Sequence, residues 1–165
     1  MAHQHPGESM AVRVVTITVS DTRTARDDTS GDTLRALLAE GGYHLGAHHI
    51  VPDEPAKLRE LVTGCVDRGE CDAVVTTGGT GIAPRDQTYE AMTALLEKTL
   101  DGFGEAFRQR SWDEIGPRAM LSRAVAGTYH GAVIVALPGS TAAVRLGVGQ
   151  LVVPMLRHAV AIAKG

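Results

Sequence analysis

The chain has 165 residues, of which 44% are hydrophobic and 21% are charged, as in a single globular domain. Its formal net charge of −3 argues against the basic surface that nucleic-acid binding requires. No apolar run approaches the roughly 20 residues of a membrane span, and the N-terminus lacks the features of a signal peptide. We therefore expect a cytoplasmic protein that binds neither nucleic acid nor membrane. Residues 1–10 read as a flexible lead-in and residues 11–165 as one domain.

Strand and helix patterns alternate through the first hundred residues. β-Branched runs predict the strands, and apolar residues at helical spacing predict the helices between them. The first helix is expected to begin with a capping box formed by Thr29 and Asp32. The expected elements are strands at residues 12–19, 48–51 and 73–77, with helices that begin near residues 29, 55 and 88.

The remainder of the chain predicts a helix, a hairpin and a final helix. Phe103, Phe107 and Trp112 are expected to face inward from a helix over residues 102–114. The short connection between strands at residues 123–128 and 132–137 implies an antiparallel pair. The last helix is expected to kink near Pro154. Together the elements predict a three-layer α/β/α fold with a mostly parallel sheet and an antiparallel edge pair.

Three polar loops follow predicted strands, at residues 20–30, 78–86 and 138–141. Ligands of such folds bind beyond the carboxyl ends of the strands. In the second loop, glycines allow close backbone approach to an anion, and the hydroxyls of Thr77 and Thr80 add donors. The loop is not a Walker A motif, because no Gly-Lys-Ser/Thr follows, and it is not a dinucleotide fingerprint, because Pro84 stands where the third glycine is required. These residues alone are consistent with a phosphate cradle or with a structural turn.

Acidic and hydroxyl side chains in these loops have similar alternatives. Asp53 and Asp86 each precede a predicted helix, so each could cap that helix or hold Mg²⁺ against a phosphate. Ser140 could cap the last helix or contact an anion. Arg123, after Ser122, could be a charged clamp or an ordinary surface residue. Asp21 belongs to an acidic loop whose carboxylates could simply be solvated.

Taken together, the loop motifs resemble those of the MoaB/MogA family of molybdenum cofactor biosynthesis proteins, which includes related domains of gephyrin. The motifs follow the family order across most of the chain. They are Ser20-Asp21-Thr22-Arg23, Asp28-Thr29-Ser30-Gly31, Pro52-Asp53-Glu54, Thr77-Gly78-Gly79-Thr80-Gly81 with Arg85-Asp86, Leu121 to Gly127, and Leu137-Pro138-Gly139-Ser140-Thr141.

The resemblance implies a domain that binds molybdopterin, a pterin with a terminal phosphate. Active members transfer AMP from Mg-ATP to that phosphate and release pyrophosphate. Asp53 and Asp86 match positions associated with catalysis and Mg²⁺, and Thr77, Gly78, Gly79, Thr80 and Gly81 match the phosphate-binding loop. The implied pocket-lining residues are Ser20, Asp21, Ser30, Ser122, Pro138, Gly139 and Ser140.

Several motifs resemble the MoaB branch, in which some members lack the acidic pair. This chain keeps Asp53 and Asp86, which favours a molybdopterin adenylyltransferase. The alternative is a non-catalytic molybdopterin-binding carrier. A nucleotide hydrolase like the competence-damage proteins is a third possibility, against which the missing second domain argues. Tyr89 departs from active relatives, which often have Pro there. The resemblance also implies a homohexamer built from two trimers, with a trimer as the next choice.

Overall fold

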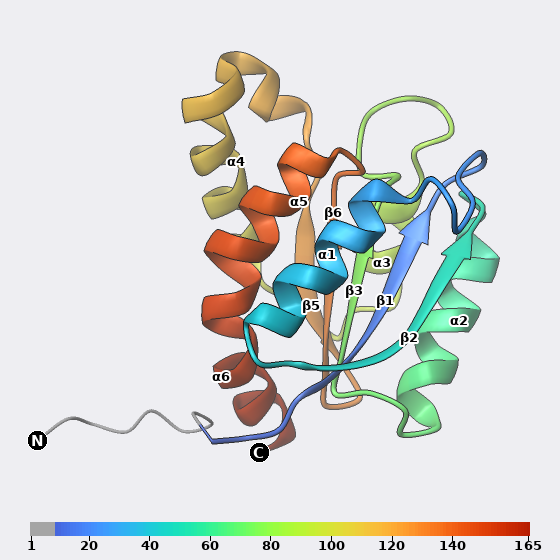
Figure 1. Cartoon of the computed structure of the whole chain (residues 1–165), viewed down its shortest axis with the longest axis vertical. Coiled ribbons are helices and arrows are strands. Elements are labelled where there is room, and N and C mark those ends of the chain that lie inside the picture. Colours follow the sequence, from blue (N-terminus) through green and yellow to red (C-terminus); the bar gives the residue numbers. More distant parts are fainter. Residues whose placement is uncertain (1–8) are drawn as a thin grey trace, which may run out of the picture.

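A computed structural model describes residues 9–165, so most of the predicted lead-in, residues 1–8, lies outside the described residues. Six strands form one sheet in the order β2-β1-β3-β6-β5-β4 (Figure 1). The four strands β2, β1, β3 and β6 are parallel, and β5 runs antiparallel to both of its neighbours. The strands are β1 Arg13–Val19, β2 His44–Val51, β3 Ala73–Thr77, β4 Lys98–Thr99, β5 Val125–Tyr129 and β6 Ala132–Leu137.

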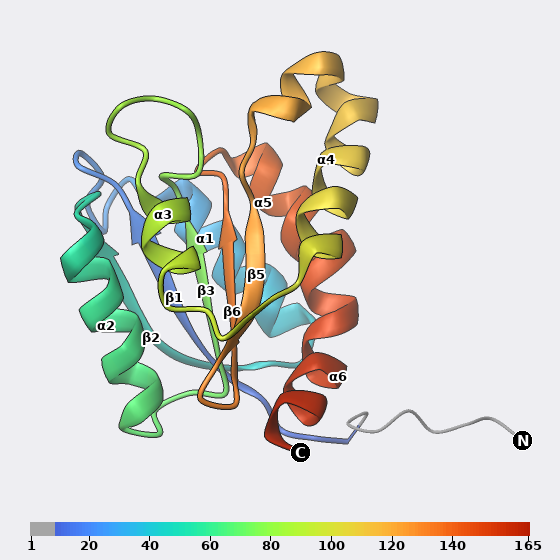
Figure 2. The ribbon, with the colours of Figure 1, turned by 180° about the vertical axis from the view of Figure 1, so that it is seen from behind.

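Helices cover both faces of this sheet and complete the predicted three layers. On one face lie α1 (Thr29–Glu40), α4 (Asp101–Ile115), α5 (Thr141–Gly147) and α6 (Val153–Lys164), as Figure 1 shows. Figure 2 shows α2 (Pro55–Asp67) and α3 (Thr88–Thr93) on the other face. A 3₁₀ helix, η1 (Gly116–Leu121), follows α4, and a π turn, η2 (Val148–Val152), joins α5 to α6. The predicted α/β fold is therefore confirmed.

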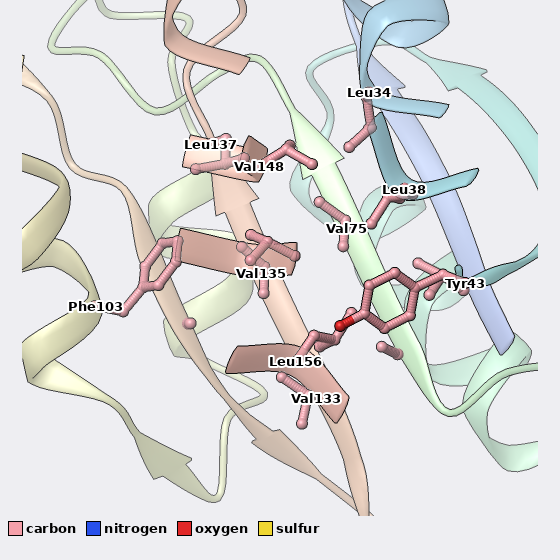
Figure 3. Close-up of a cluster of buried hydrophobic side chains, with 14 of the residues drawn as sticks. Leu34, Leu38, Tyr43, Val75, Phe103, Val133, Val135, Leu137, Val148 and Leu156 are labelled. Carbon is pink, nitrogen blue, oxygen red and sulfur yellow. The ribbon is translucent and has the colours of Figure 1, made fainter. Parts of the chain in front are cut away.

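The sheet alternates its side chains between two cores. Val133, Val135 and Leu137 of β6 point into the core shared with α1, α4 and α6 (Figure 3). The intervening Ile134 and Ala136 pack with α2 and α3. Because the sheet is covered on both faces, its central strands are buried along almost their whole length and carry mainly Val, Ile, Ala and Thr. The two cores fix the central strands, whose ends carry the polar loops.

The C-terminal helical segment is more apolar than expected. Thr141–Lys164 is long and apolar enough to cross a membrane by length and composition alone. However, its inner row is fully buried at four-residue spacing, which is the arrangement of a core helix. That row is Val144, Val148, Val152, Leu156 and Val160. The π turn η2 ends just before Pro154, where the sequence predicted a kink.

Some local predictions were wrong. The side chain of Asp28, not Thr29, caps α1 by accepting a hydrogen bond from the Gly31 amide, so the capping box does not form. Trp112 was expected to face inward but is 48% exposed. The buried face of α4 passes from Phe107 to Ser111, so the next residue, Trp112, points away from the core. Strand β2 begins at His44, four residues before the predicted start at His48. As an edge strand it has mostly half-buried side chains, so its first residues lack the apolar pattern on which the prediction relied. The short β4 and η1 were not predicted.

Candidate functional site

The three polar loops leave one edge of the sheet side by side. Thr18 of β1 pairs with Thr77 of β3, and Thr77 pairs with Leu137 of β6, so these strands end level with one another. The loop before α3 extends beyond the arrowheads of β1 and β3 (Figure 1). A cleft of about 380 Å³ opens between the loops, a volume within the usual range of small-ligand sites.

Most predicted site residues line this cleft. Ten of them do so: Ser20, Ser30, Thr77, Gly78, Gly79, Thr80, Gly81, Asp86, Pro138 and Gly139. Four predicted residues, Asp21, Asp53, Ser122 and Ser140, are not part of the lining. Ser140 caps α5 by accepting a hydrogen bond from the Ala143 amide at 3.1 Å, as the capping interpretation required. The buried Ser122 hydroxyl has no hydrogen-bond partner among the described residues.

The glycine loop, residues 78–81 after β3, turns sharply at a position where no side chain fits. Gly78 and Gly79 have φ values of 105° and 71°, which favour glycine. A Cβ on Gly78 would lie 2.2 Å from the carbonyl oxygen of Val19. The loop is therefore pressed against the end of β1, and glycine at position 78 is a steric requirement.

Two of the groups predicted to contact a phosphate already donate hydrogen bonds within the protein. The Gly78 amide donates to Leu137 O at 2.9 Å, and Thr77 Oγ1 donates to Pro138 O at 2.9 Å. The prediction that the Thr77 hydroxyl is a ligand donor is therefore wrong, since it links β3 to the loop after β6.

Donors further along the loop remain available. No described residue accepts a hydrogen bond from the amides of Gly79, Thr80 or Gly81. Thr80 Oγ1 is buried and likewise lacks a partner in the described part of the chain. Buried polar groups normally have partners. Unpaired donors at the edge of a cleft therefore indicate a site for an anion.

Neither Asp53 nor Asp86 acts as a helix cap. The N-cap residues of α2 and α3 are Glu54 and Gln87. Asp86 Oδ2 instead accepts a hydrogen bond from the Ala83 amide within its own loop, at 2.9 Å. Asp53 reaches the same loop from the end of β2 and accepts a long hydrogen bond from the Gln87 amide, at 3.3 Å. The capping interpretation is wrong for both residues.

The two carboxylates share an electrostatic environment that suits a cation. Burial raises the pKa of Asp53 above its usual value of 3.8, and the negative charges of Asp86 and Asp21 add to the rise. A hydrogen bond from the Gln87 amide and the charge of Arg85 only partly offset this. A divalent cation beside Asp53 and Asp86 would relieve the repulsion.

Asp21 links loops instead of lining the cleft. Its Oδ1 accepts a hydrogen bond from the Asp53 amide at 3.1 Å, and its Oδ2 lies 2.7 Å from Nη2 of Arg85. The Asp53 amide, followed by Arg85, lowers the pKa of Asp21. Asp21 therefore does not line the cleft as predicted. Its carboxylate is exposed, as the solvated-loop alternative expected, and it also joins the loops after β1, β2 and β3.

The sequence prediction missed Arg23, the one positively charged residue among the described residues that line the cleft. Its Nη1 donates to Ser30 Oγ at 2.9 Å and lies 3.7 Å from Asp28 Oδ1. Asp28 is 2% exposed; although burial opposes ionisation, hydrogen bonds from His48, Thr18 and Gly31 lower its pKa. A basic side chain in the loop directly after β1 was the available signal.

We predict opposite stability effects for the two linked aspartates. Because the folded-state pKa of Asp53 is raised, its charge opposes folding above pH 3.8. Asp53→Asn should raise the thermal midpoint at pH 7, and the gain should vanish as the pH falls below 3.8, where Asp53 is protonated in both states.

Asp21→Asn is the matched control. The pKa of Asp21 is lowered, so its charge favours folding above its usual pKa and this contribution is lost as the pH falls through the folded-state value. The control should therefore lower the midpoint at pH 7. Thermal unfolding monitored by circular dichroism between pH 3 and 8 measures both. A lower midpoint for Asp53→Asn at pH 7 would contradict the assignment.

Comparison with known proteins identifies the family. Residues 15–158 match the family described as "Probable molybdopterin binding domain". Molybdenum cofactor biosynthesis protein B of Bacillus subtilis is 48% identical over 90% of this chain and 88% of its own length. A crystal structure of a molybdenum cofactor biosynthesis protein B has a TM-score of 0.89 at 44% identity, covering 93% and 96% of the two chains.

An archaeal structure is also similar. The tungsten cofactor synthesizing protein MoaB from Pyrococcus furiosus has a TM-score of 0.86 at 34% identity, over 94% of this chain and 99% of its own. Family match, sequence identity and fold therefore agree. The chain belongs to the MoaB/MogA family of molybdenum cofactor biosynthesis proteins.

Proposed function

We propose that this protein binds molybdopterin in the cleft and transfers AMP from Mg-ATP to its terminal phosphate, releasing pyrophosphate. The observation that carries this proposal is the set of unpaired amides at Gly79, Thr80 and Gly81, with Asp53 packed against Gly79 and Asp86 against Gly81. We place the reaction in the cytoplasm, where the buried free thiols of Cys65 and Cys71 would remain reduced.

The residues of the cleft can act by positioning and by neutralising charge. In this reaction a phosphate oxygen attacks the α-phosphorus of ATP, a new P–O bond forms, and the bond to the departing pyrophosphate breaks. The attacking oxygen is already anionic, so the protein need not supply a strong base. The loop amides would bind phosphate oxygens, and Arg23, which also lines the cleft, would balance negative charge.

The donor set fits Mg²⁺ as the cation. The described residues contain no cluster of three or more His, Cys, Asp or Glu side chains that could hold a metal ion. Mg²⁺ is commonly held by one or two carboxylates together with substrate phosphates and water. Asp53 and Asp86 would supply those carboxylates, and when bound the ion would withdraw charge from the reacting phosphates.

We predict that the protein, mixed with molybdopterin and Mg-ATP, releases pyrophosphate and forms an AMP adduct. Asp86→Asn should lower the turnover about 100-fold or more, while much of the molybdopterin affinity is kept, because the loop amides are unchanged. Asp113→Asn, at an exposed position of α4, is the control and should keep full activity. Pyrophosphate release and mass spectrometry of the product measure both steps.

Two outcomes would contradict the proposed adenylyltransferase activity. Tight molybdopterin binding without an adduct would establish the non-catalytic carrier instead. Failure to bind molybdopterin at all, by folded protein, would reject both functions. An Asp86→Asn variant with unchanged turnover would remove Asp86 from the mechanism.

We further propose that the chain assembles as a homohexamer of two trimers, with a trimer as the next choice. Large apolar residues at the end of α4 and in η1 support self-association, since exposed patches of this kind commonly mark interfaces. They are Trp112, Ile115, Met120 and Leu121. An apolar groove between α6 and the β4 edge of the sheet is a second surface that could take part in the assembly.

Light scattering tests the assembly. We predict a mass six times the 17.4 kDa of the chain, or three times if the trimer is the final state. A mass equal to one chain at micromolar concentration would contradict self-association.

A further inference from the structure

Arg123 contacts both ends of the loop that carries Asp86. Its guanidinium donates to Gly81 O from Nε at 2.9 Å and from Nη2 at 2.7 Å. The same Nη2 donates to Asp86 O at 3.1 Å. The Arg123 amide adds a hydrogen bond to Thr80 O at 3.0 Å. One residue thus holds the backbone where the loop leaves the glycines and where it reaches Asp86.

The rest of the Arg123 side chain is held from α3. Nη1 forms an ion pair with Glu90, and Nη2 also donates to Glu90 Oε2 at 3.3 Å. The guanidinium carbon lies 5.0 Å from the centre of the Tyr89 ring. Arg123 does not line the cleft between the three polar loops, and its donors are directed at the loop and at α3.

Little else holds the segment between these two ends. Residues 82–85 are exposed. Besides the hydrogen bonds that Asp86 makes to Ala83 within the segment, Arg85 pairs with Asp21. Both carbonyls that the Arg123 guanidinium binds lie next to functional groups, namely the unpaired amides of the glycine loop and the carboxylate of Asp86. A shift of this backbone would move both groups relative to a ligand.

We propose that Arg123 is a positioning residue: it holds residues 81–86 so that the loop amides and the Asp86 carboxylate face the cleft, and it makes no contact with the ligand. This proposal rests on the proposed adenylyltransferase function. From the sequence, Arg123 could have been a charged clamp on a ligand or an ordinary surface residue. In the structure its guanidinium instead binds the loop backbone and Glu90. Lysine cannot replace it, because one ammonium group cannot reproduce the planar fork that reaches two carbonyls and a carboxylate.

The test compares Arg123→Ala and Arg123→Lys with Arg118→Ala, which removes an exposed arginine of neighbouring η1. Arg123→Ala should lower kcat about 100-fold, the loss expected of a misplacement near 1 Å, with a smaller rise in the KM for molybdopterin, because the displaced loop amides also bind its phosphate less well. Added guanidinium should restore about tenfold of the lost rate. Arg123→Lys should recover little activity, and Arg118→Ala should match the wild type.

Amide hydrogen exchange gives a readout that does not need turnover. Exchange over residues 79–87 should accelerate in Arg123→Ala while the strands stay protected, and Arg118→Ala should show no change. If the wild-type protein binds molybdopterin without turnover, the enzyme proposal fails and exchange alone decides the role of Arg123.

Two results would overturn the proposal. One is unchanged exchange and unchanged kcat in Arg123→Ala. The other is a large rise in KM at unchanged kcat, which would make Arg123 a ligand contact. If Arg123→Ala does not fold, Glu90→Gln, which removes only the ion pair, is measured by the same two readouts, with smaller changes in the same direction expected.

Discussion

The close approach of the Gly78 backbone to the end of β1 is the constraint on which the site depends. Any side chain at position 78 would collide with the carbonyl oxygen of Val19, and the Gly78 amide is used by Leu137 of β6. The glycine loop is thereby bound to two neighbouring strands before it reaches the ligand. Those strands are buried between two helical layers, so the next three residues, whose amides are unpaired, line the cleft from a rigid base.

Long-range polar contacts then hold the other loops around this base. Asp21 joins the Asp53 backbone to Arg85, and Arg123 joins the glycine loop to α3. These side chains provide order without occupying the cleft. The negative charge of Asp86 adds to the raised pKa of Asp53, and this repulsion supports the proposal of a cation and a phosphate ligand at the site. The hydrogen bonds of Asp21 and Arg123 fix the positions of the loops. The charges of Asp53 and Asp86 are left to interact with the proposed cation and ligand.

Much of this arrangement was predictable from the sequence. Alternating β-branched and helical patterns predicted the three layers, and the polar loops fell at the carboxyl ends of strands where ligands bind. The partners of individual side chains were not predictable. Arg85 and Asp21 are separated by 64 residues, and Arg123 and Gly81 by 42, so no local pattern connects them. Likewise, the sequence predicted Thr29 as the cap of α1, and only the packed structure shows that the adjacent Asp28 takes this role.

The central claim is that the backbone amides of Gly79, Thr80 and Gly81 bind a phosphate with help from a cation at the two aspartates. The most direct measurement is an NMR titration of ¹⁵N-labelled protein with molybdopterin in the presence and absence of Mg²⁺. The account predicts that these three amides show the largest saturable shifts, while the Gly78 amide, already bonded to Leu137, shifts less. Saturable shifts confined to another surface, with these amides unchanged, would contradict it.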